Sequence, residues 1–162
     1  MSQQEVFFGE NEFIVSKTDL GGRVTYGNAL FIKISGYEEN ELIGAPHNIL
    51  RHPDMPALVF KLLWETVKTG EEIFAYALNQ NKEGNYYWVF AHVTPSINGD
   101  GKIIGYHSVR RKPTEKALKV IKPLYAELLR AEKAGGISAS QKIFDTLLQQ
   151  KGVSYEELVF SL

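Results

Sequence analysis

The spacing of apolar residues along the chain predicts five β-strands in two groups. Residues 12–16 and 23–26 are β-rich runs on either side of a Gly-containing turn, which is typical of a hairpin. Residues 73–80, 86–96 and 102–111 have a period of two, and the turn sequences NKEGN and NGDG separate them. We expect the last three strands to form a meander.

Between the two groups of strands, apolar residues recur at helical spacing. Short helices are predicted over residues 29–35 and 38–42, and a longer one begins at Met55 or Pro56 and ends at Thr69. The stretch that precedes the long helix holds three prolines in eleven residues and is predicted to be irregular. The pattern indicates an α+β domain with one sheet and its helices on one face.

Beyond Pro113 the chain is predicted to be helical. Helices are expected over residues 114–134 and 138–150, with a Gly-Gly pair between them, and a short helix begins near Ser154. Pro123 falls inside the first of these helices and is expected to kink or split it.

We therefore divide the chain into three parts: an N-terminal segment (1–10), a domain (11–112) and a C-terminal helical appendage (113–162). Apolar positions in the appendage need covering by the domain, by a second copy or by a receptor. We expect that cutting after Lys112 leaves cofactor binding intact and abolishes partner binding.

Composition excludes several classes of site. The chain has 162 residues, a net charge of -1 and no cysteine, so disulfides, thiolate metal sites and thiolate-ligated haem are ruled out. The near-neutral charge argues against binding to nucleic acid or to an anionic membrane surface. No run of 18 apolar residues predicts a membrane span, and the first ten residues do not resemble a signal peptide. We expect a cytoplasmic protein.

Several motifs resemble those of PAS domains. The front half carries NALF, SGY and ELIG within residues 28–44, and the back half carries the hairpin at 81–89 and IGYHSVR at 104–110. The more specific segment is HNILRHPDMP at 47–56, which is similar to the segment that distinguishes Aer-type PAS domains. The resemblance covers roughly residues 10–125.

This resemblance implies a PAS fold: a five-stranded antiparallel sheet with a cofactor pocket between sheet and helices. It implies FAD as the cofactor and a role as a redox sensor in energy taxis. The chain looks like the stand-alone sensor half of a bipartite system, whose partner is a membrane chemoreceptor or another signalling protein. The sequence leaves open whether the chain also forms a homodimer. No nucleophile elbow, phosphate-binding glycine loop or HExxH metal pair indicates an enzyme.

The candidate cofactor-binding residues lie in the loop, the long helix and the strands: Asn28, Arg51, His52, Asp54, Phe60, Trp64, Phe74, Asn79, His92 and His107. Asn28 and Asp54 are also suited to be helix N-caps. Phe74 stands where the family often has Trp.

Five of the candidates have side chains whose chemistry suits a flavin site. Arg51 and His52 could hold a phosphate, and the alternative for both is an ordinary loop residue. Phe60 and Trp64 lie four residues apart on one helix face, where they either stack on a flavin or fill the core. Asn79 has an amide that could exchange donor and acceptor roles when a flavin is reduced.

Two other functions stay open at this stage. A haem b sensor on the same fold would use His52, His92 or His107 as its axial ligand. A cofactor-free interaction domain would fill the pocket with its own aromatic side chains, which make up 12% of the residues.

Overall fold

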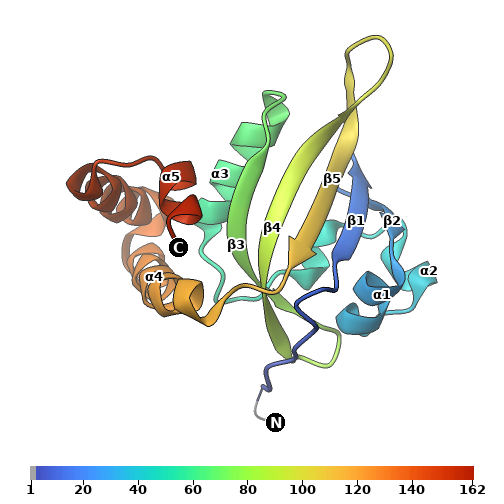
Figure 1. Cartoon of the computed structure of the whole chain (residues 1–162), viewed down its shortest axis with the longest axis horizontal. Helices are drawn as coiled ribbons and strands as arrows, with labels where there is room; N and C mark the ends of the chain where they lie inside the picture. The colour runs from blue at the N-terminus through green and yellow to red at the C-terminus, as the bar shows by residue number, and fades with distance from the viewer. Residues whose placement is uncertain (1–2) are drawn as a thin grey trace.

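The computed structural model describes residues 3–162, and it confirms the five-stranded antiparallel sheet (Figure 1). The strands are β1 (Ile14–Asp19), β2 (Val24–Gly27), β3 (Ile73–Gln80), β4 (Tyr86–Ile97) and β5 (Ile103–Arg111). Their order in the sheet is β2-β1-β5-β4-β3. The first strand therefore pairs with the last, which brings the N-terminal hairpin beside the C-terminal meander.

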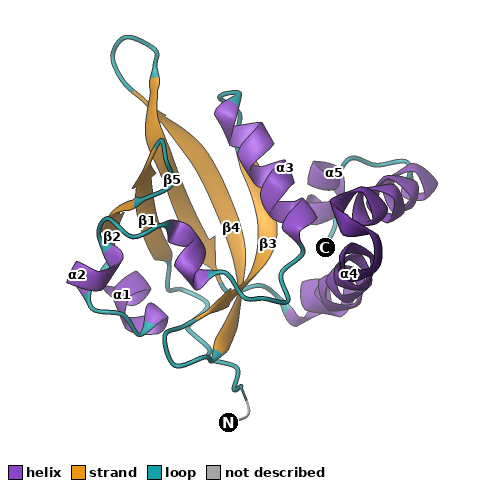
Figure 2. Cartoon of the chain, turned by 180° about the vertical axis from the view of Figure 1, so that it is seen from behind, coloured by secondary structure: helices purple, strands orange, loops and turns teal. Residues whose placement is uncertain are grey.

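The three predicted helices and one further helix cover one face of this sheet (Figure 2). They are α1 (Ala29–Ser35), α2 (Glu39–Leu42), the 3₁₀ helix η1 (His47–Leu50) and α3 (Ala57–Lys68). The helix η1 forms inside the proline-rich segment that was predicted to be irregular. None of the helices in residues 3–162 is long and apolar enough to traverse a bilayer.

Asn28 is the N-cap of α1, as its sequence position predicts. Its Oδ1 accepts a hydrogen bond from the Phe31 N–H at 3.0 Å and another from the Val15 N–H at 3.1 Å. Its Nδ2 donates to the Phe13 carbonyl at 2.8 Å. The side chain therefore joins α1 to β1 and to the residue before it.

Asp54 does not cap α3, so that prediction is wrong. The N-cap is Pro56, which has no side chain able to accept a hydrogen bond. The free N–H groups of Ala57 and Leu58 donate instead to the two carboxylate oxygens of Glu132, both at 2.9 Å. The cap comes from a residue 75 positions away, and no local pattern could reveal it.

The C-terminal part contains α4 (Glu115–Lys151) and α5 (Tyr155–Phe160). The break in α4 lies at Gly136, where φ is 75° and ψ is −172°, and this confirms the predicted interruption at the Gly-Gly pair. The helix does not split at Pro123, because Gly136 is its one residue with non-helical backbone angles. Figure 1 shows the two halves of α4 as separate rods beside β3.

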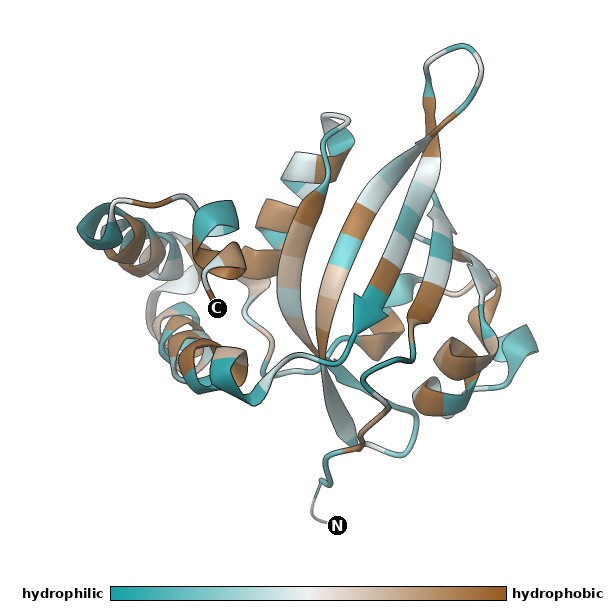
Figure 3. Ribbon diagram, in the orientation of Figure 1, coloured by the Kyte–Doolittle hydropathy of each residue, from teal (hydrophilic) through white to brown (hydrophobic). Residues whose placement is uncertain are grey.

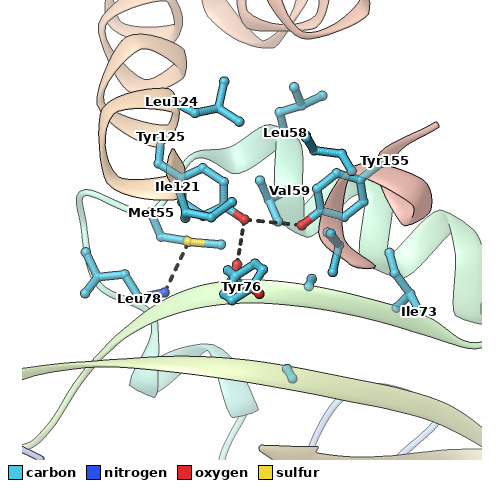
Figure 4. Packing of buried hydrophobic residues seen from close by; sticks show 14 of the residues in the cluster. Met55, Leu58, Val59, Ile73, Tyr76, Leu78, Ile121, Leu124, Tyr125 and Tyr155 are labelled. Atoms are coloured by element: carbon cyan, nitrogen blue, oxygen red, sulfur yellow. Dashed lines mark hydrogen bonds between the residues drawn. The ribbon is translucent and has the colours of Figure 1, made fainter. Parts of the chain in front are cut away.

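The helices α4 and α5 share the main hydrophobic core with the sheet. Tyr125 donates to the Tyr76 carbonyl at 2.7 Å and lies 3.3 Å from the Tyr155 hydroxyl, and all three tyrosines are buried (Figure 4). Ile121 and Leu128 are fully buried in the same cluster. Apolar residues recur along one side of each half of α4 in Figure 3. The appendage is therefore packed on the domain.

The N-terminal segment also packs on the domain. The Val6 N–H donates to the Tyr86 carbonyl at 2.7 Å, and the Tyr86 N–H donates to the Gln4 carbonyl at 2.9 Å. Phe8 is buried in a second cluster together with residues of β1 and α1.

Candidate functional site

A cavity of about 510 Å³ lies between the helix-covered face of the sheet and the segment from η1 to α3. This volume is within the range of small-molecule and cofactor sites. Every strand except β2 contributes to its wall, as do the β1–β2 turn, η1, α3 and α4. Its lining combines polar, basic and aromatic side chains, and it includes Ser16, Thr18, Gly22, His47, Arg51, Phe60, Lys61, Trp64, Asn79, Tyr106, Arg110 and Ile137.

A hydrogen-bonded cluster of three side chains forms one wall. Arg110 Nη2 donates to Ser16 Oγ at 2.5 Å, and Arg110 Nη1 lies 3.2 Å from His47 Nε2. A guanidinium can only donate, so His47 Nε2 is the acceptor and the imidazole is neutral. Ser16 Oγ lies 2.9 Å from the same nitrogen and can donate its own proton there.

Electrostatics agree with this protonation pattern. Burial of the His47 ring, followed by the nearby Arg110 charge, lowers the pKa of His47 to about 3. Burial also lowers the pKa of Arg110 to about 10, which leaves the guanidinium charged at neutral pH. Arg110 has only 3% of its surface exposed.

The cavity has positive charge and no carboxylate. As far as residues 3–162 are concerned, its lining includes Arg51, Lys61 and Arg110 but no Asp or Glu. Two buried polar atoms in this described part of the chain lack a hydrogen-bond partner, Arg110 Nε and Thr18 Oγ1, and both belong to lining residues. A buried charge without a counterion is costly, so such a site is suited to a ligand with acceptor or anionic groups.

The basic residues near the mouth lie on the loop and on α3. Arg51 is exposed, and its guanidinium carbon lies 4.4 Å from the centre of the Phe60 ring. The backbones of Arg51 and Asn79 form an antiparallel bridge, which ties the loop to β3. Lys61, the next residue of α3, is exposed, and its Nζ lies 3.9 Å from Glu65 Oε1 in a surface ion pair. These cations can meet phosphate groups that reach toward solvent.

Aromatic residues form the apolar walls. The Trp64 and Tyr106 rings meet edge to face, with centroids 5.3 Å apart. Trp64 also lies close to Gly22, where a Cβ atom would be 3.4 Å from the indole ring and φ is +82°. Flat apolar walls of this kind accommodate a planar ring system.

Four of the ten predicted site residues line the cavity: Arg51, Phe60, Trp64 and Asn79. Phe60 and Trp64 are half-buried, and they pack against the main hydrophobic core as well as lining the cavity, so stacking on a flavin stays a prediction for both. Gln80, the next residue after Asn79, points elsewhere and donates to the Gly84 carbonyl at 3.3 Å.

Three candidates on strands lie on the opposite face of the sheet, so their expected place at the cavity is corrected. Successive strand residues point to opposite faces. Ala91 and Val93 line the cavity, and His92 between them cannot. His107 likewise alternates with lining residues of β5, and Phe74 stacks on His92 with ring centroids 4.0 Å apart.

The remaining candidates stabilise local structure. His52 is buried, but its Nε2 lies 3.0 Å from Gln3 Oε1 and its Nδ1 accepts from the Asp54 N–H at 2.9 Å. Burial lowers the pKa of His52. Asp54 is exposed, Asn28 caps α1, and none of the three lines the cavity. The haem alternative thus loses all three axial ligands predicted for it.

Sequence reasoning missed His47, Arg110, Ser16 and Ile137. The signal for Arg110 was present, because it stands two and four residues after Ser108 and Tyr106 on one strand face. His47 opens the motif that carries the family resemblance. Nothing local indicated that Ile137, in the appendage, reaches the cavity.

Comparisons with known proteins agree with this fold. The aerotaxis receptor of Escherichia coli (strain K12) is 38% identical over 152 residues, which cover 94% of this chain and 29% of that receptor. The nitrogen fixation regulatory protein of Klebsiella pneumoniae is 26% identical over 60% of this chain and 20% of its own length. The chain therefore spans less than a third of either relative.

Solved structures show the same architecture. The light-state structure of the blue-light photoreceptor Aureochrome1 LOV superposes with a TM-score of 0.59 at 21% identity, over 70% of this chain and 90% of that one. The PAS domain of a Colwellia psychrerythraea protein superposes with a TM-score of 0.58 at 20% identity, over 64% of this chain and 87% of that one. The sequence pattern of the PAS fold matches residues 24–110, and the chain belongs to this family.

Proposed function

We propose that this chain is a PAS sensory domain that holds a flavin, FAD, in the cavity and passes its redox state to a signalling protein. A sensory role agrees with the relatives, which include a receptor and a regulatory protein. The flavin is supported by the Aer-type motif at residues 47–56 and by the chemistry of the cavity wall.

The residues present fit a flavin. Trp64, Phe60 and Tyr106 offer apolar surfaces to a planar ring, and the orphaned Arg110 Nε and Thr18 Oγ1 indicate that the wall is incompletely satisfied by protein groups. A flavin, when bound, accepts electrons and gains negative charge on reduction. No carboxylate in the described lining opposes that charge.

The chain's own groups then have distinct tasks. Arg110 keeps a positive charge in the cavity wall, and the hydrogen bonds to Ser16 and His47 hold its orientation. Asn79 is buried and carries both a donor and an acceptor, so it can respond to a change in the protonation of a neighbouring ring. Arg51 and Lys61 are positioned at the solvent side to meet phosphate.

The single observation that carries the proposal is the buried Arg110 guanidinium, which faces a cavity of about 510 Å³ and has no acidic partner among the described lining residues. A purely structural arginine in such a place would be expected to pair with a carboxylate.

The test is the absorption spectrum of the full chain as purified, followed by titration of flavin-free protein with FAD, FMN and riboflavin. We expect the visible absorption bands of an oxidised flavin, and tightest binding of FAD among the three. A colourless protein that takes up none of the three would overturn the proposal. A haem spectrum instead would also overturn it.

The proposed function also implies a partner protein and a cellular location. We propose that the partner is a membrane chemoreceptor, and that the chain works in the cytoplasm without entering the bilayer and without catalysing a reaction. The chain covers 29% of the aerotaxis receptor, so the other functions of such a receptor lie outside these 162 residues. Co-sedimentation with receptor-containing membranes tests this, and a chain that stays in the supernatant in both redox states contradicts it.

A further inference from the structure

We propose that the C-terminal appendage is part of the ligand site, so that flavin binding and docking of α4 stabilise each other. This rests on the proposed function. Two residues of α4 carry the inference: Glu132 holds the N-terminus of α3, and Ile137 lines the cavity. Both residues lie beyond residues 24–110, which the sequence pattern of the PAS fold matches.

Glu132 makes a two-pronged contact with α3. Its Oε2 accepts from the Ala57 N–H and its Oε1 from the Leu58 N–H, each at 2.9 Å. Both bonds are charge-assisted, and they place a negative group at the positive end of the helix dipole. The first turn of α3 has no side-chain cap of its own, so its N-terminus depends on α4 for these bonds.

The same carboxylate is tied to the second half of α4. Ser140 is fully buried, and its hydroxyl lies 3.1 Å from Glu132 Oε1. Between them Gly136 adopts φ 75° and ψ −172°, a backbone region almost restricted to glycine. This break turns the chain so that Ile137 lines the cavity while 37% of its surface stays exposed.

Helix α3 connects the two contacts. Phe60, Lys61 and Trp64 line the cavity from this helix, whose first turn Glu132 holds. A ligand that packs on these residues and on Ile137 favours the docked position of α4. Because such coupling is reciprocal, undocking of α4 must weaken ligand binding by the same factor.

The first measurement is hydrogen exchange of the full chain with and without FAD. The test variant is Glu132→Gln, and the matched control is Glu127→Gln, an exposed glutamate of the same helix that has no side-chain hydrogen bond in the described structure. We expect faster exchange in the first turn of α3 and in residues 137–151 for Glu132→Gln only. We also expect FAD to slow exchange in those residues of the wild type. Unchanged exchange on adding FAD overturns the linkage.

The second measurement is FAD affinity by fluorescence titration. Glu132→Gln and Ile137→Ala are expected to weaken FAD binding about tenfold each, in the range of ordinary coupling energies. Ile104→Ala is the control for the second variant, since Ile104 is an isoleucine that is 55% exposed and does not line the cavity. If Glu132→Gln fails to fold, Ser140→Ala replaces it, with a smaller loss of affinity expected.

The outcomes separate the two proposals. If the wild-type chain takes up no flavin, both the proposed function and the linkage are overturned. A wild-type chain that binds FAD, with variants that bind it equally well, overturns the linkage alone. Weaker binding in both variants and in neither control supports the linkage.

Discussion

His47 Nε2 and Arg110 Nη1 lie 3.2 Å apart on the wall of the cavity, a neutral imidazole that accepts from a buried cation. The arrangement keeps Arg110 oriented without neutralising it, because neither His47 nor Ser16 carries a negative charge. A carboxylate in the same place would hold the arginine more strongly but would cancel the positive field in the cavity.

Arg110→Met should separate stability from binding. Among the described residues the buried Arg110 charge has no acidic partner, so its removal is expected to leave the free energy of unfolding of flavin-free protein unchanged or to raise it by about 1–3 kcal/mol. FAD affinity should fall at least tenfold, roughly, because the charge facing the ligand is lost. Urea unfolding and flavin titration measure the two effects.

The control for that prediction is Arg130→Met, since Arg130 is exposed on α4 and does not line the cavity. It should change neither quantity. A strongly destabilised Arg110→Met protein that still binds FAD normally would show that Arg110 is structural.

Protonation of His47 is expected to lower the free energy of unfolding in acid. Its pKa is about 3 in the folded protein, below the ordinary value of 6.5. The unfolded chain therefore binds a proton between these values that the folded chain does not, and stability falls as pH decreases through this window. Between pH 7 and pH 5 the expected loss from this residue is about 1–2 kcal/mol.

Urea unfolding at the two pH values, for wild type and His47→Gln, checks the effect. The variant should lose this part of the pH dependence. Equal pH dependence in both proteins would mean that His47 is not held neutral.

Tyr125→Phe tests how firmly the appendage is held on the sheet. The hydroxyl donates to the Tyr76 carbonyl at 2.7 Å in a buried place, and its loss leaves that carbonyl with one bond fewer (Figure 4). The expected cost is about 1–2 kcal/mol in the free energy of unfolding. Tyr26→Phe, at a position that is 47% exposed, should cost almost nothing. Equal effects in thermal unfolding would argue against a specific hydrogen bond.

The structure changes the expected result of cutting after Lys112. Removal of residues 113–162 would uncover Met55, Tyr76 and Trp88, which are buried in one cluster with α4 and α5 residues. It would also remove the Glu132 cap of α3. We now expect a truncated chain that aggregates or lacks fixed tertiary packing, together with loss of flavin binding. Near-ultraviolet circular dichroism and sedimentation measure this, and a soluble, cooperatively folded fragment that binds FAD would contradict it.

The elements themselves followed from local patterns. The alternation in residues 73–80 and 102–111, the glycine turns and the capping residue Asn28 are short-range features, and each corresponds to a strand, turn or cap in the structure. The motif at residues 47–56 placed Arg51 near the cavity, and the helical spacing placed Phe60 and Trp64 on one face.

Only the tertiary structure decided which side of the sheet each side chain faces. It also decided which residues far apart in sequence are in contact. Because side chains alternate along a strand, His92 and Ala91 must point to opposite faces of the sheet. Only the packing of α3 decides which face holds the cavity. Glu132 caps a helix 75 residues earlier, and Arg110 meets Ser16 across 94 residues. Contacts of this range depend on how the layers pack, which local spacing does not encode.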